Sequence, residues 1–344
     1  MLKLTYKLTG DGLPSWALRW IVLPGLLVIA IAVSLAVGSF HVSLADALGW
    51  VRGDLDESRR AVLTNLLFAI RLPRIVAGVV IGAALSTSGT AFQALFVNPL
   101  VSPSLLGVLA GASFGAAVGI LFSFSLVQIQ LLAFVFGMLA VGLALTLVRK
   151  RGVRSRVALV LGGIISGAFF TALLSLVKYV ADPDNQLPSI VYFLMGSLAQ
   201  VNLKMALWAG GVMLLGTFGL IAYGQQLNAL SMGEDEAHCL GVNVERAQLV
   251  IISLATLVGA LSVVVGGVIG WVGLIVPHLA RLLCGPDNTR LLPASALLGA
   301  LYLLVLDDIS RTVFPVEVPI GVLTALFGIP CFAVLFRRSR GGWR

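Results

Sequence analysis

Residues 247–278 read AQLVIISLATLVGALSVVVGGVIGWVGLIVPH, a run without a single Asp, Glu, Lys or Arg. A membrane-spanning helix needs roughly 20 apolar residues, so this run holds one complete crossing and most of a second. Similar runs fill the rest of the chain, in which 59% of the residues are hydrophobic and 11% are charged. Soluble domains carry about 25% charged residues. The sequence therefore predicts a polytopic membrane protein.

The apolar runs are expected to be helices. Only helices and closed barrels satisfy their backbone groups in lipid, and barrel strands would alternate apolar and polar residues. We expect an all-α fold in which residues 1–344 form one transmembrane domain, with a flexible tail at about 1–18 and a cytoplasmic loop at about 225–246. About ten membrane-spanning helices are predicted, near residues 20–39, 75–97, 104–122, 127–148, 157–177, 205–224, 247–265, 271–285, 291–306 and 318–336.

The charged residues indicate how the chain is oriented. With ten crossings both termini lie on one side, and that side holds 15 of the 23 Lys and Arg residues. The other side holds 8 basic residues and 9 of the 15 acidic ones. Excess positive charge marks the cytoplasmic face, so both termini are predicted to be cytoplasmic and the protein to lie in the bacterial inner membrane. The net charge of +8 then reflects topology rather than nucleic-acid binding.

Ionisable side chains are missing from the centres of the predicted spans. Ion-coupled carriers place such groups inside the bundle, where the coupling ion needs a partner. Here Lys178, Asp307, Asp308 and Arg311 fall near outer ends, and Gln93 is the notable polar residue inside a span. The chain also lacks a phosphate-binding GxxxxGK[ST] loop. If the protein moves a solute uphill, another subunit is expected to supply the energy.

Catalytic and metal chemistry find no support in the sequence. An enzyme needs convergent acid, base, nucleophile or metal groups, and no such constellation is visible. The three cysteines and three histidines fall in separate segments without CxxC spacing, so neither a metal site nor a disulfide framework is expected. They are Cys239, Cys284, Cys331, His41, His238 and His278.

Glycines four residues apart mark the third predicted span, at Gly107, Gly111, Gly115 and Gly119. Glycine at this spacing lets helix backbones approach closely. Tight helix packing is the simpler interpretation, and a groove for a ligand is the alternative. Together with Gln93, these residues are the candidates for helix packing or for the translocation pathway.

The loop at 225–246 predicts a short cytoplasmic helix, about two turns long. Ser231 to Glu234 has the form of a capping box, the acids at 234–236 suit the first turn of a helix, and Gly241 can end it in a left-handed conformation. Asn243 can cap the next helix. The loop is either an ordinary connector or a rigid lever that fits a cleft on a cytosolic partner.

A second short helix is predicted in the long outer loop before residue 71. Ser58 could cap it, and Val62, Leu66 and Ile70 would share one face at i, i+4 spacing. We expect this helix to lie along the outer membrane surface.

Several motifs in order resemble the FecCD family, the permease subunits of bacterial ABC importers of type II for iron–siderophores, haem and cobalamin. The resemblance covers about residues 61–336. The motifs are RLPR at 71–74, GAALSTSGTAFQALFVNPLVSPSLLGVLAGASFGA at 82–116, MGS at 195–197, LNALSMGEDEAHCLGV at 227–242, GWVGLIVPHLAR at 270–281 and PIGVLTALFGIP at 319–330.

The resemblance implies ten helices per subunit and a complex with other chains. Two permease subunits, identical or related, would surround a central pathway, two cytosolic ATPases using ATP and Mg would bind below, and a periplasmic binding protein would dock above. Arg71, Arg74 and Arg311 match the arginines that receive acidic residues of the binding protein. Arg311 has an alternative in local pairing with Asp307 or Asp308.

The helix that enters the ATPase in family members maps onto the cytoplasmic loop of this chain. Its matching residues are Ser231, Met232, Gly233, Glu234, Asp235, Glu236, Ala237, Leu240 and Gly241. Two positions depart from the family. The loop at 154–157 slips by a residue or two, which leaves the inner gate unassigned, and Val97 stands where many members have an arginine before Asn-Pro.

The expected function is therefore the permease of an ATP-driven importer, with no cofactor, metal or catalytic group of its own. An iron–siderophore is the expected substrate, with haem, cobalamin or molybdate as alternatives. Two other classes remain open on the residues alone: a secondary transporter or channel acting by itself, and an integral membrane enzyme. The first would need intramembrane charges and the second a catalytic cluster.

Overall fold

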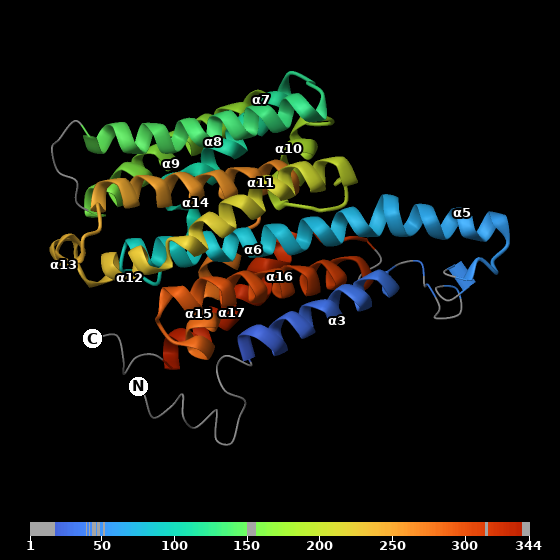
Figure 1. The fold of residues 1–344 in the computed structure, drawn as a ribbon. Helices are drawn as coiled ribbons and strands as arrows, with labels where there is room; N and C mark the ends of the chain where they lie inside the picture. The colour runs from blue at the N-terminus through green and yellow to red at the C-terminus, as the bar shows by residue number, and fades with distance from the viewer. Residues whose placement is uncertain are drawn as a thin grey trace.

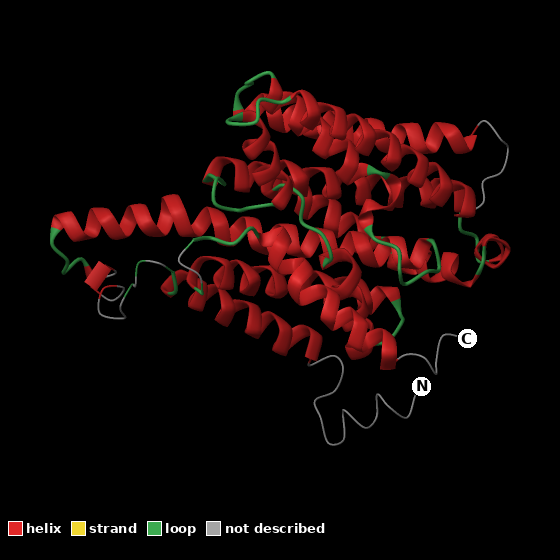
Figure 2. Ribbon diagram, turned by 180° about the vertical axis from the view of Figure 1, so that it is seen from behind, coloured by secondary structure: helices red, strands yellow, loops and turns green. Residues whose placement is uncertain are grey.

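A computed structural model of the chain describes residues 18–38, 40, 42, 46, 49–50, 52–149, 156–313 and 316–338. These residues form a bundle of helices joined by short loops, with no strand among them (Figures 1 and 2). The predicted N-terminal tail lies outside this part of the chain. The helices are η1 (Leu18–Val22), α3 (Leu23–Ala36), α5 (Glu57–Asn65), η2 (Leu66–Arg71), α6 (Leu72–Leu95), η3 (Pro103–Leu106), α7 (Val108–Leu121), α8 (Leu126–Arg149), α9 (Arg156–Val180), α10 (Gln186–Met195), α11 (Leu203–Ala222), α12 (Gly224–Met232), α13 (Glu234–Cys239), α14 (Val244–Gly266), α15 (Val272–Cys284), α16 (Asn288–Thr312) and α17 (Ile320–Arg338).

Each of the ten predicted membrane-spanning segments coincides with a helix. Among the described residues, six helices are long and apolar enough to cross a membrane by length and composition, and five shorter apolar helices accompany them. The described chain enters α3 and leaves α17 at the end of the bundle that also carries α12 and α13 (Figure 1). This end is called the inner end below, and the opposite end, from which α5 projects, is called the outer end.

Helix α6 lies at the centre of the bundle, because small residues let neighbouring helices pack directly on its backbone. A side-chain carbon added at Gly82 would lie 2.2 Å from the carbonyl oxygen of Gly299 in α16. One added at Gly89 would lie 1.9 Å from the carbonyl oxygen of Gly273 in α15. Such close approach is typical of helices that pack through small residues in lipid. In α6, Ile81, Ala84 and Ala91 are at most 1% exposed.

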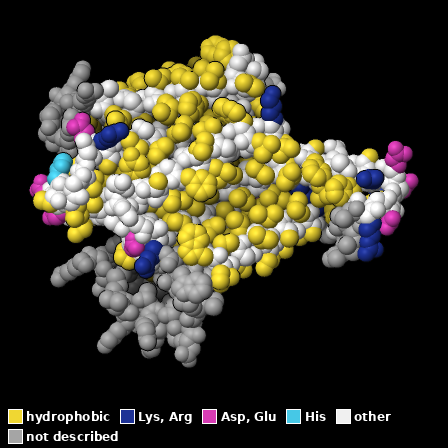
Figure 3. Space-filling view, viewed as in Figure 1, with side chains coloured by type: hydrophobic (Ala, Val, Ile, Leu, Met, Phe, Trp, Pro, Cys, Tyr) yellow, Lys and Arg dark blue, Asp and Glu magenta, His cyan; other side chains and the backbone are white. Residues whose placement is uncertain are grey.

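The outer surface of the bundle is apolar, as its solvent requires. Hydrophobic side chains cover most of the face shown in Figure 3, and the charged groups gather at its two ends. On α11, Leu207, Trp208, Leu215 and Phe218 are each more than half exposed. A soluble monomer rarely exposes contiguous apolar area on this scale, so this surface is one that faces lipid.

The helical segment that precedes α6 does not lie as predicted for the outer loop. Residues Glu57–Leu95 form one continuous helix of 39 residues, about 58 Å long at 1.5 Å per residue. The hydrocarbon core of a bilayer is only about 30 Å thick. The prediction that 58–70 lies along the membrane surface is wrong: α5 continues the direction of α6 beyond the bundle (Figure 1). Asp56, rather than Ser58, is the N-cap residue of α5.

Candidate functional site

The inner end of the bundle carries the short helix α13. Its C-terminus closes with two hydrogen bonds, from Gly241 N–H to His238 C=O (2.9 Å) and from Val242 N–H to Ala237 C=O (3.0 Å). This pair of bonds is the Schellman motif, which needs a residue with positive φ. Gly241 supplies it with a φ of +78°. The sequence-based prediction that Gly241 ends the helix is confirmed.

The start of this helix differs from the prediction. Ser231 is not its N-cap, because Ser231 lies inside α12 and donates to the carbonyl oxygens of Leu227 (2.7 Å) and Ala94 (3.3 Å). The predicted capping box is therefore wrong. Gly233, with a φ of +145°, separates α12 from α13, and the loop contains two short helices rather than one. The acids at 234–236 do fall in the first turn of α13.

Helix α13 is fixed to the bundle on one side and open on the other. Ala237 is fully buried, and Gln248 of α14 donates to Glu234 (3.1 Å). Asn243 caps α14 by accepting from the N–H of Arg246, as predicted. On either side of α13, Met232 and Leu240 are 67% and 63% exposed. Two large apolar side chains are thus exposed at the inner end, one before and one after α13.

Helix α12 is attached to the start of α16 by a pair of side-chain contacts. Asn228 donates from Nδ2 to Asp287 (2.8 Å), and its Oδ1 accepts from the backbone N–H of Asn288 (2.8 Å). Asp287 also caps α16 by accepting from the N–H of Thr289 (3.0 Å). The hydrogen bond from Asn228, followed by those from Thr289, holds the pKa of Asp287 below its usual value. Sequence reasoning missed this contact, although the Asp-X-Thr pattern at 287–289 is an N-cap signal.

Charged side chains from three helices meet at the outer end. Arg74 of α6 binds Asp307 of α16 through Nε (2.8 and 2.9 Å) and Glu317 through Nη1 (2.8 and 3.0 Å). Arg311 lies 3.7 Å from Asp307 and contacts Asp308. These residues, with Arg71 and with Ser34 of α3, are called the outer charge cluster.

The outer charge cluster also ties α3 to the bundle. Arg311 donates from Nη2 to the carbonyl oxygen of Ser34 (2.8 Å) and to its hydroxyl (2.6 Å). Arg71 donates to the carbonyl oxygens of Leu35 and Phe40. Arg74 and Arg311 pair with the three acids Asp307, Asp308 and Glu317. With Arg71, the cluster holds three basic and three acidic side chains, so its formal charges balance. Buried charges are tolerated only with such pairing.

The three arginines expected to dock a binding protein are therefore buried in this structure. Arg71, Arg74 and Arg311 are 2%, 6% and 7% exposed. The local pairing of Arg311 with Asp307 and Asp308, expected as the alternative, is present. Docking through these arginines stays a prediction. Glu317, which sequence reasoning did not single out, is the most exposed residue in the ion pairs of the outer charge cluster, with 40% of its side chain accessible.

The glycines of the third span contact neighbouring backbones. Side-chain carbons added at Gly111 and Gly115 would lie 2.3 Å from carbonyl oxygens of α8, and one added at Gly119 would meet Ile129. Gly107 is not inside α7 but precedes it with a φ of +80°, close to Gly167 of α9. All four glycines thus lie at close contacts between helices.

Gln93 lies at the inner part of α6, 2% exposed. It donates to the carbonyl oxygen of Leu274 (3.3 Å) and accepts from Nη2 of Arg281 (3.3 Å), both on α15. This polar residue is therefore a contact between α6 and α15.

Two motif segments, 195–197 and 319–330, meet the end of α14 at one backbone junction. Gly196 follows α10, and its carbonyl oxygen accepts from the N–H of Ile320 at the start of α17 (2.9 Å). The N–H of Ser197 donates to the carbonyl oxygen of Gly266 at the end of α14 (2.9 Å). A side-chain carbon at Gly321 would lie 2.4 Å from the carbonyl oxygen of Met195. Irregular backbone is thereby satisfied within the protein, as membrane depth requires.

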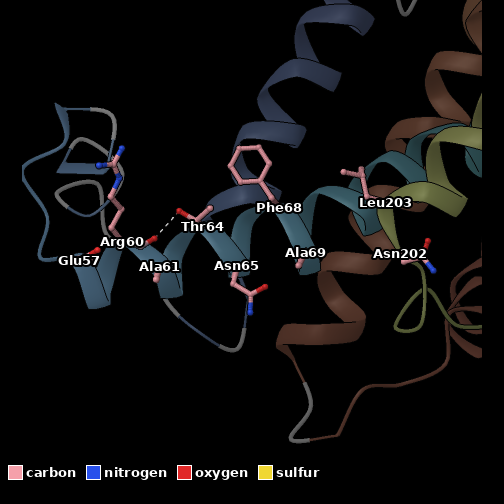
Figure 4. A pocket seen from close by; sticks show the side chains of 9 residues that line it. All are labelled: Glu57, Arg60, Ala61, Thr64, Asn65, Phe68, Ala69, Asn202 and Leu203. Atoms are coloured by element: carbon pink, nitrogen blue, oxygen red, sulfur yellow. Dashed lines mark hydrogen bonds between the residues drawn. The ribbon is translucent and has the colours of Figure 1, made fainter.

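An open groove of about 800 Å³ lies beside the projecting helix at the outer end (Figure 4). Its walls come from α5 and η2, including Arg60, Thr64 and Phe68, and from Asn202 and Leu203 at the start of α11. The Thr64 hydroxyl donates to the carbonyl oxygen of Arg60 (2.7 Å). Within the described part of the chain, no three His, Cys, Asp or Glu side chains gather as they would to hold a metal ion.

Comparison with protein families gives a match over most of the chain. The model of the FecCD transport family matches residues 26–338. A solved metal-chelate type ABC transporter in an inward-facing conformation is similar in structure, with a TM-score of 0.84 and 37% sequence identity. The similarity covers 92% of this chain and 97% of that one.

Characterised permeases are similar in sequence. The molybdate import permease MolB of Haemophilus influenzae is 39% identical over 320 residues, which cover 92% of this chain and 95% of the relative. The hemin transport permease HmuU of Yersinia pestis is 39% identical, with 82% and 86% covered. The cobalamin import permease BtuC of Halobacterium salinarum is 38% identical, with 78% and 72% covered.

Proposed function

We propose, from the premise that this chain belongs to the FecCD transport family, that it passes an iron chelate through the inner membrane of a bacterium. The chain is a multi-pass permease of an ABC importer, and its family consists of permeases rather than enzymes. Such a permease works with an ATPase, a substrate-binding protein and a second permease. Two copies of a separate cytosolic ATPase, using ATP and Mg, are proposed to hydrolyse the nucleotide.

The observation that carries the proposal is the inner face formed by α12 and α13. A helix of fewer than two turns would fray in isolation, yet α13 is fixed by a buried alanine, a Schellman motif and a hydrogen bond to α14. Rigidity combined with the exposed side chains Met232 and Leu240 suits a contact that transmits force. We assign this face to the ATPase, which places both termini in the cytoplasm.

The outer end is assigned to the binding protein. Docking is proposed at the outer charge cluster, where an acidic partner would compete with Asp308 and Glu317 for the three arginines. Charge pairing at such a rim fixes register and steers encounter more than it adds affinity. The central pathway would lie between this chain and a second permease, identical or related, and a solute would be passed on rather than held.

The choice of substrate rests on the relatives. Their names include iron chelate, hemin, cobalamin and molybdate permeases. Iron chelate is our first proposal, supported by the similarity to a metal-chelate type transporter. Molybdate is the second candidate, because the molybdate permease matches the greater share of both chains among the three relatives compared above.

Uptake into proteoliposomes tests both the class and the substrate. The chain is reconstituted with its ATPase and binding protein, and radioactive ferric chelate or molybdate is supplied outside. ATP-dependent accumulation of the ferric chelate is expected. Accumulation of molybdate instead would make molybdate the substrate and leave the assignment as an ABC importer unchanged. Uptake by the chain alone on a proton or sodium gradient would identify a secondary transporter and refute the proposal.

The assignment of the inner face has its own test, Gly241→Val. The φ of +78° at Gly241 strains any β-branched residue, so the end of α13 should be displaced. Transport per ATP hydrolysed is expected to fall, while the chain still assembles. The matched control is Gly53→Val, which has the same strain at a φ of +81°, equally open surroundings and a place on the outer side. Equal coupling in both variants would remove the assignment.

A further inference from the structure

We infer that Asn228 is a positioning residue for transport, because it clamps the ATPase-facing helices to α16 and thereby to the outer charge cluster. The inference rests on the proposed function, since it concerns how the inner face communicates with the outer end. Its elements are the Asn228–Asp287 contact, the pair of helices α6 and α16, and Arg74 with Asp307.

The clamp is specific in its geometry. Both polar atoms of the Asn228 amide are used: Nδ2 donates to the Asp287 carboxylate, and Oδ1 accepts from the N–H of Asn288, each at 2.8 Å. Asn288 is 4% exposed, and Gly224 at the start of α12 leaves room for the backbone at Thr289. A hydrogen bond to a charged group is roughly twice as strong as a neutral one. Movement of α12 must therefore carry the start of α16 with it.

Helix α12 also holds the inner end of α6. The Ser231 hydroxyl reaches the carbonyl oxygen of Ala94 at 3.3 Å. The same nine-residue helix thus touches the inner ends of both α6 and α16. A movement of α12 therefore displaces α6 and α16 together rather than independently.

Along their length α6 and α16 behave as one body. Their backbones meet at Gly82 and Gly299, where an added side-chain carbon would lie 2.2 Å from the opposite carbonyl oxygen. The Ser86 hydroxyl donates to the carbonyl oxygen of Ser295 (2.6 Å), and the Thr90 hydroxyl donates to the Ser295 hydroxyl (2.9 Å). The two backbones touch at Gly82 and Gly299, and the Ser86 side chain bonds across the same crossing, so the two helices move together.

The outer ends of the same two helices are joined by the buried pair Arg74 and Asp307. Helix α16 has 25 residues, and about 30 Å of helix lies between Asp287 and Asp307 at 1.5 Å per residue. A change in Arg74 or Arg311 at docking would therefore be felt at Asn228, and a change at the ATPase would be felt by the arginines. This supplies a physical connection between the two partner surfaces.

The test measures ATP hydrolysis by the complete complex in proteoliposomes, with and without the loaded binding protein. Asn228→Ala is expected to reduce the stimulation by the binding protein on the order of tenfold, as loss of a hydrogen bond to a charged group predicts. Asn228→Asp should reduce it further, because two carboxylates would then face each other.

The decisive variant is the exchange Asn228→Asp with Asp287→Asn. The amide at 287 would donate to the carboxylate at 228, which still accepts from the N–H of Asn288, and asparagine remains a good N-cap for α16. Stimulation should return. Arg290→Gln is the matched control, because it removes the exposed ion pair of Asp287 (3.2 Å) and leaves the clamp intact.

Two results would overturn the inference: wild-type stimulation in Asn228→Ala, or an exchange variant that assembles but is as defective as Asn228→Asp. If Asn228→Ala does not assemble, the exchange variant alone decides. A wild-type complex whose ATP hydrolysis ignores the binding protein would instead refute the proposed function, so the two failures are distinguishable.

Discussion

The substitution Gly82→Ala adds one methyl group at the crossing of α6 and α16. The new carbon would lie 2.2 Å from the carbonyl oxygen of Gly299 and 2.7 Å from its carbonyl carbon. Ordinary contact begins near 3.4 Å, so the two helices must part by about 1.2 Å. The obstacle is backbone, which cannot rotate away as a flexible side chain could.

The expected cost follows from what this separation breaks. The Ser86–Ser295 hydrogen bond would lengthen from 2.6 Å to about 3.8 Å, and the Thr90–Ser295 bond from 2.9 Å to about 4.1 Å. Side-chain hydrogen bonds inside membrane proteins contribute about 0.6 kcal/mol each. Overpacking a tight contact adds about 1–3 kcal/mol. We expect Gly82→Ala to lower the free energy of unfolding by roughly 2–4 kcal/mol.

Thermal unfolding of the purified chain in detergent measures this change. The matched control is Gly142→Ala in α8, where nothing lies within 4 Å of the added carbon. That variant should be neutral or more stable, since alanine favours a helix over glycine by up to about 1 kcal/mol. Equal melting temperatures for Gly82→Ala and the wild type would refute the direct backbone contact between α6 and α16.

The remaining predictions concern charge. Asp307→Asn should lower the free energy of unfolding by about 3–5 kcal/mol, because it leaves Arg74 and Arg311 buried without their shared carboxylate. Chemical denaturation in detergent measures this free energy. A loss below about 1 kcal/mol would contradict the pairing. Asp287 has a pKa lowered chiefly by Asn228, so its contribution to stability is present above the unfolded pKa of about 3.9 and is lost as the pH falls through the lower folded pKa. Melting curves between about pH 3 and pH 7 should therefore converge at acid pH for the wild type and Asp287→Asn, and a constant difference would exclude this linkage.

Helix positions were within reach of sequence reasoning, and the contacts between helices were not. Apolar run length and the positive-inside pattern predict the ten spans, and Gly241 and Asn243 carry local capping signals that need only a few neighbouring residues. Ser231 shows the limit of such signals: the pattern 231–234 fits a capping box, yet tertiary contacts with Ala94 and Leu227 keep Ser231 inside α12. The direction of α5 was predicted wrongly for the same reason, because no local signal in residues 57–71 indicates whether the helix ends before α6 or continues into it.

Hydropathy, charge asymmetry and motif order can be read along the chain, so they were enough to predict a helical membrane protein of the FecCD family without ion-coupling charges at the centres of its spans. The burial of Arg71, Arg74 and Arg311, the contact of Asn228 with Asp287, and the backbone contact between α6 and α16 became known from the folded protein. Asn228 and Asp287 are 59 positions apart, and Arg311 and Ser34 are 277 positions apart. No local rule links such distant residues; packing brings them together because charges in lipid need partners and glycine backbones allow close approach.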